Sequence, residues 1–90
     1  MGIQVFLHPH FNDVVKGAQT VEARGETMMQ VIEDIEGKYP GFKAEVIDEV
    51  GKFRGFLEIF LNGQALFPDE TGKRVKDGDE IAIFVMVGGG

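Results

Sequence analysis

The sequence predicts an α+β fold of two layers, in which one main helix packs on one face of a mixed sheet of four to five strands. Several segments alternate apolar and other side chains with the two-residue period of a half-buried strand. One segment repeats its apolar residues at intervals of three and four, which is the period of an amphipathic helix. Two strand-like segments precede the helical one and three follow it, so we expect the helix to connect two parts of one sheet.

The first two strand-like segments are predicted to form an antiparallel hairpin. Residues 2–8 alternate, which places Ile3, Val5 and Leu7 on one face. A loop that contains Pro9 interrupts the pattern, and the alternation resumes over residues 19–24. Consecutive strands usually lie side by side, so we expect a hairpin with a long connection.

A helix is predicted to follow the hairpin. Thr27 and Gln30 have the spacing of a capping box, in which the threonine hydroxyl accepts a free N–H of the first turn and the glutamine reaches back. The apolar stripe that should face the sheet consists of Met28, Val31, Ile32, Ile35 and Tyr39. Gly37 costs about 1 kcal/mol relative to alanine inside a helix, so the last turn is expected to fray before Pro40 and Gly41 end it.

The middle of the chain contains one ambiguous segment and a clear hairpin signal. Residues 42–52 are interpreted as a short helical turn under a loop, and residues 56–61 alternate like a strand. The pair Asn62 and Gly63 favours a type I′ turn, in which both central residues have positive φ. Residues 64–67 are therefore predicted to form a short returning strand.

The last strand is predicted over residues 80–87, after a turn at residues 77–79. A right-handed crossover through the helix would place it beside the first strand, in the centre of the sheet. This is the strand order of the β-grasp fold. We expect residues 1–87 to form one such domain, with residues 88–90 as a flexible glycine tail.

The charge balance restricts the possible partners. The chain carries 9 Lys and Arg against 15 Asp and Glu, a formal net charge of −6. Nucleic acid is not expected as a partner, because basic side chains would have to neutralise its phosphates, and partners with basic grooves fit better. No apolar run approaches the ~18–20 residues of a membrane helix, so we expect a cytoplasmic protein that has no membrane partner and is monomeric alone.

The residue types exclude several kinds of site. The chain has no cysteine, which excludes thiolate metal sites and thiol nucleophiles, and no serine, which excludes a Ser-His-Asp hydrolase. His8 and His10 have a spacing that can chelate a metal ion, but no third ligand accompanies them, so no metal site is expected.

Positive charge concentrates at two places in the sequence, which are Lys52 with Arg54, and Lys73 with Arg74 and Lys76. Most such side chains are simply solvated. Some of them are candidates to meet acidic groups of a partner near the C-terminal tail.

Aromatic side chains occupy strand positions where alternation would normally place polar ones. These residues are Phe6, Phe56, Phe60 and Phe84. The first, third and last long strands are neighbours in a β-grasp sheet, so the rings would share one face, and contiguous exposed apolar area marks an interaction surface. We predict a docking patch around Phe60 and Phe84. The alternative is that a loop or residues 42–52 fold over some of these rings.

Three segments together resemble the ubiquitin-like sulfur carriers of the ThiS/MoaD family. They are Gly-Glu-Thr at residues 25–27, ahead of a helix that closes with Tyr-Pro-Gly at residues 39–41; residues 51–63; and residues 76–81, which lead to a terminal glycine pair. The likeness covers nearly the whole chain. The cysteine-synthesis carriers and the small subunit of molybdopterin synthase are the most similar types.

This resemblance implies a protein co-substrate with no catalytic residue and no bound cofactor. A ubiquitin-activating-like adenylyltransferase would use MgATP to convert the Gly90 carboxylate into an acyl-adenylate. A sulfur donor would then displace AMP and leave a C-terminal thiocarboxylate. An acceptor enzyme, either cysteine-synthase-like or the large subunit of molybdopterin synthase, would take the sulfur.

The glycine tail suits this role physically. Gly88 and Gly89 have no Cβ, so they can thread a slot that is too narrow for other residues. Family members usually end in two glycines whereas this chain ends in three, which leaves open which carboxylate reacts.

Two other functions remain open at this point. One is a ubiquitin-like modifier joined to lysines through Gly90, and the other is a passive β-grasp interaction domain. The sequence also leaves open which metabolite would receive the sulfur.

Overall fold

The computed structural model describes residues 2–86, so residue 87 of the predicted last strand and the predicted glycine tail lie outside the described residues. The helices and strands are β1 (Ile3–Leu7), β2 (Thr20–Ala23), α1 (Met28–Lys38), α2 (Phe42–Val46), β3 (Leu57–Leu61), β4 (Gln64–Ala65) and β5 (Glu80–Val85), with the 3₁₀ turns η1 (Pro9–Phe11) and η2 (Glu70–Gly72).

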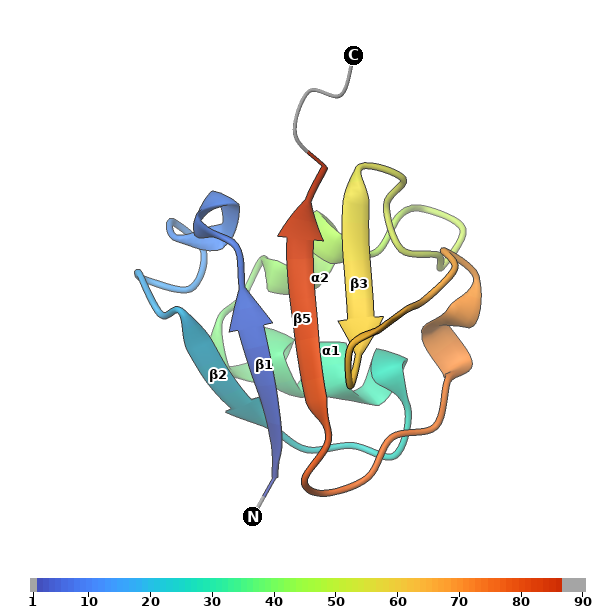
Figure 1. The fold of residues 1–90 in the computed structure, drawn as a ribbon. Helices are drawn as coiled ribbons and strands as arrows, with labels where there is room; N and C mark the ends of the chain where they lie inside the picture. Colours follow the sequence, from blue (N-terminus) through green and yellow to red (C-terminus); the bar gives the residue numbers. More distant parts are fainter. Residues whose placement is uncertain (1, 87–90) are drawn as a thin grey trace.

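The strands form one sheet in the order β2-β1-β5-β3-β4. β5 runs parallel to β1 and antiparallel to β3, so the last strand is central, as the crossover argument predicts. Figure 1 shows α1 and α2 together behind the sheet, with nothing helical in front of its central strands. The predicted two-layer β-grasp arrangement is confirmed.

The predicted N-terminal hairpin is also confirmed, with Val5 opposite Val21 in antiparallel register. Its first strand stops at Leu7 because Pro9 begins the turn η1. The backbone N–H of His10 donates to His8 Nδ1 at 2.9 Å, which caps this turn. The sequence predicted a plain loop here, and the structure shows an ordered turn instead.

The start of α1 follows the predicted capping pattern with one difference. The N–H of Gln30 donates to Thr27 Oγ1 at 3.2 Å, as expected. The Gln30 side chain accepts the N–H of Glu26 at 2.8 Å, one residue before the threonine that a capping box would use. The last turn is formed rather than frayed, since the N–H of Tyr39 donates to Ile35 O at 2.8 Å.

The ambiguous segment after α1 is a helical turn, α2, whose start is fixed by a side chain of α1. The Glu36 carboxylate accepts the N–H of Gly41 at 3.0 Å and that of Lys43 at 2.7 Å. Gly41 has φ 103°, a left-handed conformation that favours glycine. Phe42 and Val46 are fully buried, so α2 contributes to the core.

The second hairpin turns where the sequence predicts. Asn62 has φ 50° and Gly63 has φ 84°, so both adopt the positive φ of a type I′ turn. The returning strand is shorter than the predicted residues 64–67. Leu66 still donates its N–H to Ile59 O at 2.8 Å, but the chain then leaves the sheet at Pro68.

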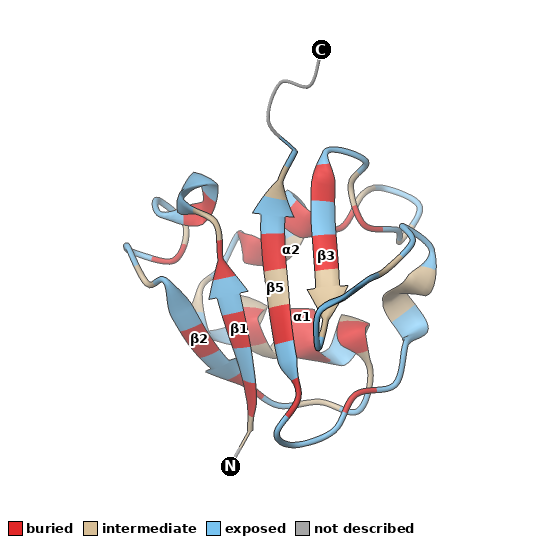
Figure 2. Ribbon diagram, in the orientation of Figure 1, coloured by how far each residue is buried: buried red, intermediate tan, exposed pale blue. Residues whose placement is uncertain are grey.

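The core lies between the helices and the inner face of the sheet. Its fully buried members include Ile3, Val5, Met28, Val31, Ile32, Ile35, Ile81 and Ile83. Figure 2 shows buried and less buried residues alternating along β1, β5 and β3, so the second face of the sheet is open to solvent. Tyr39, the last residue of the predicted stripe, is only partly buried. Over residues 2–86, no helix is long and apolar enough to cross a membrane.

Candidate docking face and tail exit

The open face of the sheet brings three of the four predicted aromatic residues together. β1, β5 and β3 are adjacent, so their outward side chains share this face. Phe6 and Phe84 are each 41% exposed, and Phe60 is half-buried. The ring centroids of Phe60 and Phe84 are 5.9 Å apart in an edge-on arrangement. We call Phe6, Phe60 and Phe84 the docking face.

Ala82 lies in the middle of the docking face and is the residue that sequence reasoning missed. It pairs with Phe6 on one side and with Phe60 on the other, so a small residue separates two large ones in a single row across the sheet. A hollow of about 250 Å³ lies over it. The signal was present in the sequence, because the alternation of the last strand gives Ala82 the same face as Phe84.

Phe56, the fourth predicted aromatic, lies at the end of the sheet where β5 finishes. It is 44% exposed, and its ring centroid is 6.0 Å from that of His10. Its carbonyl accepts the N–H of Met86 at 2.8 Å. The predicted alternative, in which residues 42–52 cover the rings, does not hold for Phe6, Phe56 or Phe84, which all remain exposed while α2 packs behind the sheet (Figure 1).

The exit of the tail is fixed by the central strand. Val85 pairs with Leu57 in the antiparallel register, and Met86 is bonded to Phe56 one step further along. On the other side of β5, Ile83 O accepts the N–H of His8 at 3.0 Å. The chain therefore stays anchored up to Met86, and the same strand carries Phe84 and Ala82 of the docking face.

The docking face has acidic residues at its border. Glu58 of β3 lies opposite Phe84 of β5. Glu80 precedes Ala82 by two residues on the same face of β5 and lies opposite Gln4 of β1. Both glutamates are exposed. Two positive groups are engaged with the helical layer, since Lys43 Nζ is 3.1 Å from Glu33 Oε2 and Arg54 Nε donates to Ala44 O of α2.

The two predicted basic groups lie at opposite ends of the sheet. Lys52 and Arg54 precede β3, whose start lies beside the end of β5 and therefore beside the tail exit. Residues 73–76 precede β5, so they lie at its other end. Arg74 there is 4.0 Å from Glu26. Of the basic residues from which some were expected near the tail, Lys52 and Arg54 lie beside its exit, whereas Lys73, Arg74 and Lys76 lie at the other end of β5.

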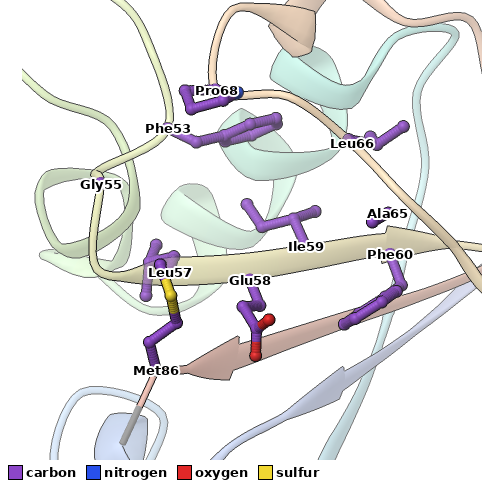
Figure 3. Close-up of a pocket in the computed structure, with 10 residues that line it drawn as sticks. All are labelled: Phe53, Gly55, Leu57, Glu58, Ile59, Phe60, Ala65, Leu66, Pro68 and Met86. Atoms are coloured by element: carbon purple, nitrogen blue, oxygen red, sulfur yellow. The ribbon is translucent and has the colours of Figure 1, made fainter. Parts of the chain in front are cut away.

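A second hollow of about 210 Å³ lies along the free edge of β3 (Figure 3). It exists because β4 pairs only with the last two residues of β3, Phe60 and Leu61. Its walls are mainly apolar and include Phe53, Leu57, Ile59, Leu66 and Pro68. Figure 3 shows the side chains of Glu58 and Phe60 on the opposite side of β3 from those of Phe53, Ile59 and Leu66. The walls suit apolar contact and hold no group of side chains for acid–base or nucleophilic chemistry.

The histidine pair serves local structure. His8 Nδ1 accepts the N–H of His10, and His10 Nε2 is 3.6 Å from Glu45 Oε1. Within residues 2–86 there is no group of three or more His, Cys, Asp or Glu that could hold a metal ion.

The Asp-Gly-Asp motif before β5 is also structural. Asp79 is buried, and its carboxylate accepts hydrogen bonds from Asn62 Nδ2 at 3.0 Å and from the N–H of Lys76 at 2.9 Å. The bond from Asn62, followed by that from Lys76, holds the pKa of Asp79 below its usual value. Asn62 Oδ1 in turn accepts the N–H of Glu80 at 2.9 Å. This network ties the β3–β4 turn to the start of β5.

Comparison with known proteins gives consistent matches along the chain. Residues 10–90 match the model of the ThiS family. The sulfur carrier protein CysO of Mycobacterium tuberculosis is 31% identical over 93 residues, covering 100% of this chain and 96% of that protein.

Solved structures agree with this match. The crystal structure of the Amycolatopsis orientalis BexX/CysO complex aligns with a TM-score of 0.89 at 30% identity, covering 99% of this chain and 100% of that one. Small archaeal modifier protein 1 of Methanosarcina acetivorans aligns with a TM-score of 0.76 at 25% identity, covering 98% and 95%.

Proposed function

Because this chain belongs to the ThiS family, we propose that it is a sulfur carrier protein whose C-terminal Gly90 carboxylate is activated and converted to a thiocarboxylate. The observation that carries the proposal is the course of β5, the central strand, which ends at Val85, three residues before a run of glycines begins in the sequence. The match to CysO along the whole chain supports the same role.

The chemistry consists of two displacements at the chain end. A Gly90 carboxylate oxygen attacks the α-phosphorus of MgATP and expels pyrophosphate, which gives an acyl-adenylate. A sulfide sulfur then attacks the acyl carbon and expels AMP, which leaves the thiocarboxylate. A free carboxylate is a poor acyl donor, and the adenylate supplies the leaving group that it lacks.

The residues of this chain bind the partner and present the C-terminal carboxylate to it, and they do not catalyse the reaction. We propose that the docking face and Phe56 contact the partner. Gly88 and Gly89 then pass through a narrow slot in the partner. The catalytic groups and the MgATP then belong to a ubiquitin-activating-like adenylyltransferase, so this chain is a co-substrate and not itself an enzyme. A cytoplasmic location is part of the proposal.

The proposal extends to the destination of the sulfur. Similarity to CysO favours cysteine or a related thio-metabolite over molybdopterin as the product. The acceptor would accordingly be a cysteine-synthase-like enzyme. The crystal structure of a BexX/CysO complex supports the docking of a partner protein on the carrier.

Removal of Gly90 tests the proposal. Incubation of the intact chain with the adenylating enzyme of its organism, MgATP and sulfide should increase its mass by one oxygen-to-sulfur exchange. The variant that lacks Gly89 and Gly90 should show no exchange at an unchanged melting temperature, because neither glycine has a side chain to contribute to the core. The exposed-site variant Val50→Ala is the control and should react normally. Normal exchange in the truncated chain would refute the proposal.

One observation favours an alternative function, that of a ubiquitin-like modifier. The fold is also similar to small archaeal modifier protein 1, at 25% identity. A ubiquitin-like modifier would form isopeptide conjugates through Gly90, visible as a ladder of heavier species in a lysate supplied with MgATP. A passive interaction domain would show neither conjugates nor sulfur exchange.

A further inference from the structure

We propose that the hollow over Ala82 receives one bulky apolar side chain of the adenylating partner, and that Glu58 and Glu80 meet basic side chains around that anchor. This inference rests on the proposed function and specifies the chemistry of the partner's docking surface.

The row of side chains across the sheet gives the hollow its shape. Ala82 ends at its Cβ, whereas Phe6 and Phe60 stand on either side of it in the same row. Phe84 follows Ala82 on the same face of β5 and is in contact with the Phe60 ring. The result is an apolar depression with aromatic walls on the open face of the sheet.

The size of the hollow favours a single side chain as its occupant. Its volume of about 250 Å³ lies below the range of roughly 300–1,000 Å³ that is typical of pockets for small molecules. Interfaces between proteins are commonly centred on one aromatic or aliphatic anchor that fills a pocket of this kind. The anchor is therefore expected on the partner, because this chain supplies the hollow.

The charges around the hollow select the kind of partner. Glu80 lines the hollow, and Glu58 lies beside Phe84. Neither Lys nor Arg lines this hollow or the neighbouring one, which shares Phe6, Ala82 and Phe84 with it. A surface that presents Lys or Arg around an apolar anchor is complementary to this arrangement.

The same charges argue against a second copy of this chain as the occupant. In a symmetric dimer the same patch of both copies would meet, so the glutamates of one copy would face those of the other. Like charges opposed in this way are unfavourable. A negatively charged membrane surface is disfavoured for the same reason.

The position of the hollow limits how far the partner's anchor side chain can lie from its adenylation site. Ala82 and Gly90 are eight residues apart in the sequence. A fully extended chain of that length spans roughly 26–29 Å. The partner's anchor and basic side chains must therefore lie within that distance of the site where it adenylates the glycine.

Filling the hollow is the first test. Ala82→Leu adds an apolar side chain at an outward position of the strand, and Ala44→Leu makes the identical change at an exposed site of α2. ATP–pyrophosphate exchange by the adenylating enzyme of the same organism is measured with each full-length chain as substrate. We expect the KM for Ala82→Leu to rise at least tenfold with kcat unchanged, and Ala44→Leu to match the wild type.

Reversal of the border charges is the second test. The double variant Glu58→Lys with Glu80→Lys should bind the partner more weakly, and its binding should lose the salt dependence of the wild type. The double variant Glu49→Lys with Asp69→Lys carries the same change in net charge at exposed sites elsewhere and is the control. Circular dichroism and thermal melts verify that all variants fold.

The outcomes separate this inference from the proposed function. If the wild-type chain supports no ATP–pyrophosphate exchange by the adenylating enzyme, the proposed function fails and the inference fails with it. If the wild type supports exchange and Ala82→Leu behaves like Ala44→Leu, the function stands and the inference is overturned. Sedimentation of the wild type as a dimer that Ala82→Leu converts to monomer would also overturn it, because a second copy would then occupy the hollow.

Discussion

Two carboxylates hold backbone segments in place at the residue scale. Glu36 joins α1 to the start of α2, and the N–H of Lys43, then that of Gly41, lowers the pKa of its carboxyl group. Asp79 joins the β3–β4 turn to β5, and its pKa is lowered chiefly by the bond from Asn62. In both cases hydrogen bonds stabilise the charged form in the folded chain.

The stability of the protein should therefore fall in acid. Both carboxyl groups have lower pKa values in the folded chain than in the unfolded chain. As the pH drops, the unfolded chain therefore binds more protons than the folded chain does, which favours unfolding. The stabilisation from these groups is complete above about pH 5 and is lost as the pH falls through the folded pKa values. Urea unfolding at pH 7, 4 and 3 measures this loss. Glu36→Gln should lose less stability between pH 7 and 3 than the wild type does.

The matched control for this prediction is Glu49→Gln, which changes an exposed carboxylate in a turn. It should keep the acid dependence of the wild type. A pH dependence for Glu36→Gln that equals the wild-type one would show that the bonds to Gly41 and Lys43 do not persist in solution.

Single residues were predictable from sequence where strand alternation decides their face. Phe6, Phe60 and Phe84 follow the alternation and reach the open face. The role of Glu36 was not predictable in this way, because it depends on where the chain returns after Gly41. A carboxylate on a helix surface has the same local pattern whether it caps a second helix or is only solvated.

At the scale of elements, two glycines near the end of α1 should respond oppositely to the same substitution. Gly37 lies inside α1 with open space where a Cβ would be placed. Gly37→Ala should therefore raise the free energy of unfolding by about 0.5–1 kcal/mol. Gly41 has φ 103°, so Gly41→Ala should lower it by about 1–2 kcal/mol. Equilibrium urea unfolding distinguishes the two, and changes of the same sign would contradict the predicted roles.

The elements that periodicity predicts well are those that pack a complete face on the core. α1 and the long strands belong to this class, since each buries a regular stripe. β4 and α2 differ because distant contacts set their bounds. β4 ends at Ala65, and the chain beyond it is held by the loop before β3, since Pro68 O accepts the N–H of Phe53 at 2.9 Å. Glu36 fixes the start of α2 from a different helix. A local pattern does not contain these contacts.

At the scale of the whole molecule, β5 links the docking face to the chain end. The crossover rule and the order of the segments were enough to place it in the sheet centre. They were not enough to place the charged groups. Residues 73–76 lie close in sequence to the start of β5, which is the end remote from the tail, while the antiparallel direction of β3 brings residues 52–56 beside the tail exit.

This arrangement predicts that a charge on β5 will block docking while the fold survives. In Phe84→Asp, a carboxylate replaces an exposed aromatic ring on the open face, which removes apolar contact area and places a charge that must be desolvated when an apolar partner surface docks. Affinity for the adenylating enzyme should fall about tenfold or more, as for a central interface residue. Aspartate in a strand costs up to about 1 kcal/mol, so the melting temperature should fall by no more than about 4–8 °C.

Phe67→Asp is the matched control, because Phe67 is 74% exposed in the loop after β4 and lies outside the docking face. Titration calorimetry with the adenylating enzyme should give wild-type affinity for this variant. If both aspartate variants bind as tightly as the wild type, the partner does not use the open face of the sheet. The tail would then have to be recognised without it, and the course of β5 would serve only to anchor the chain up to Met86.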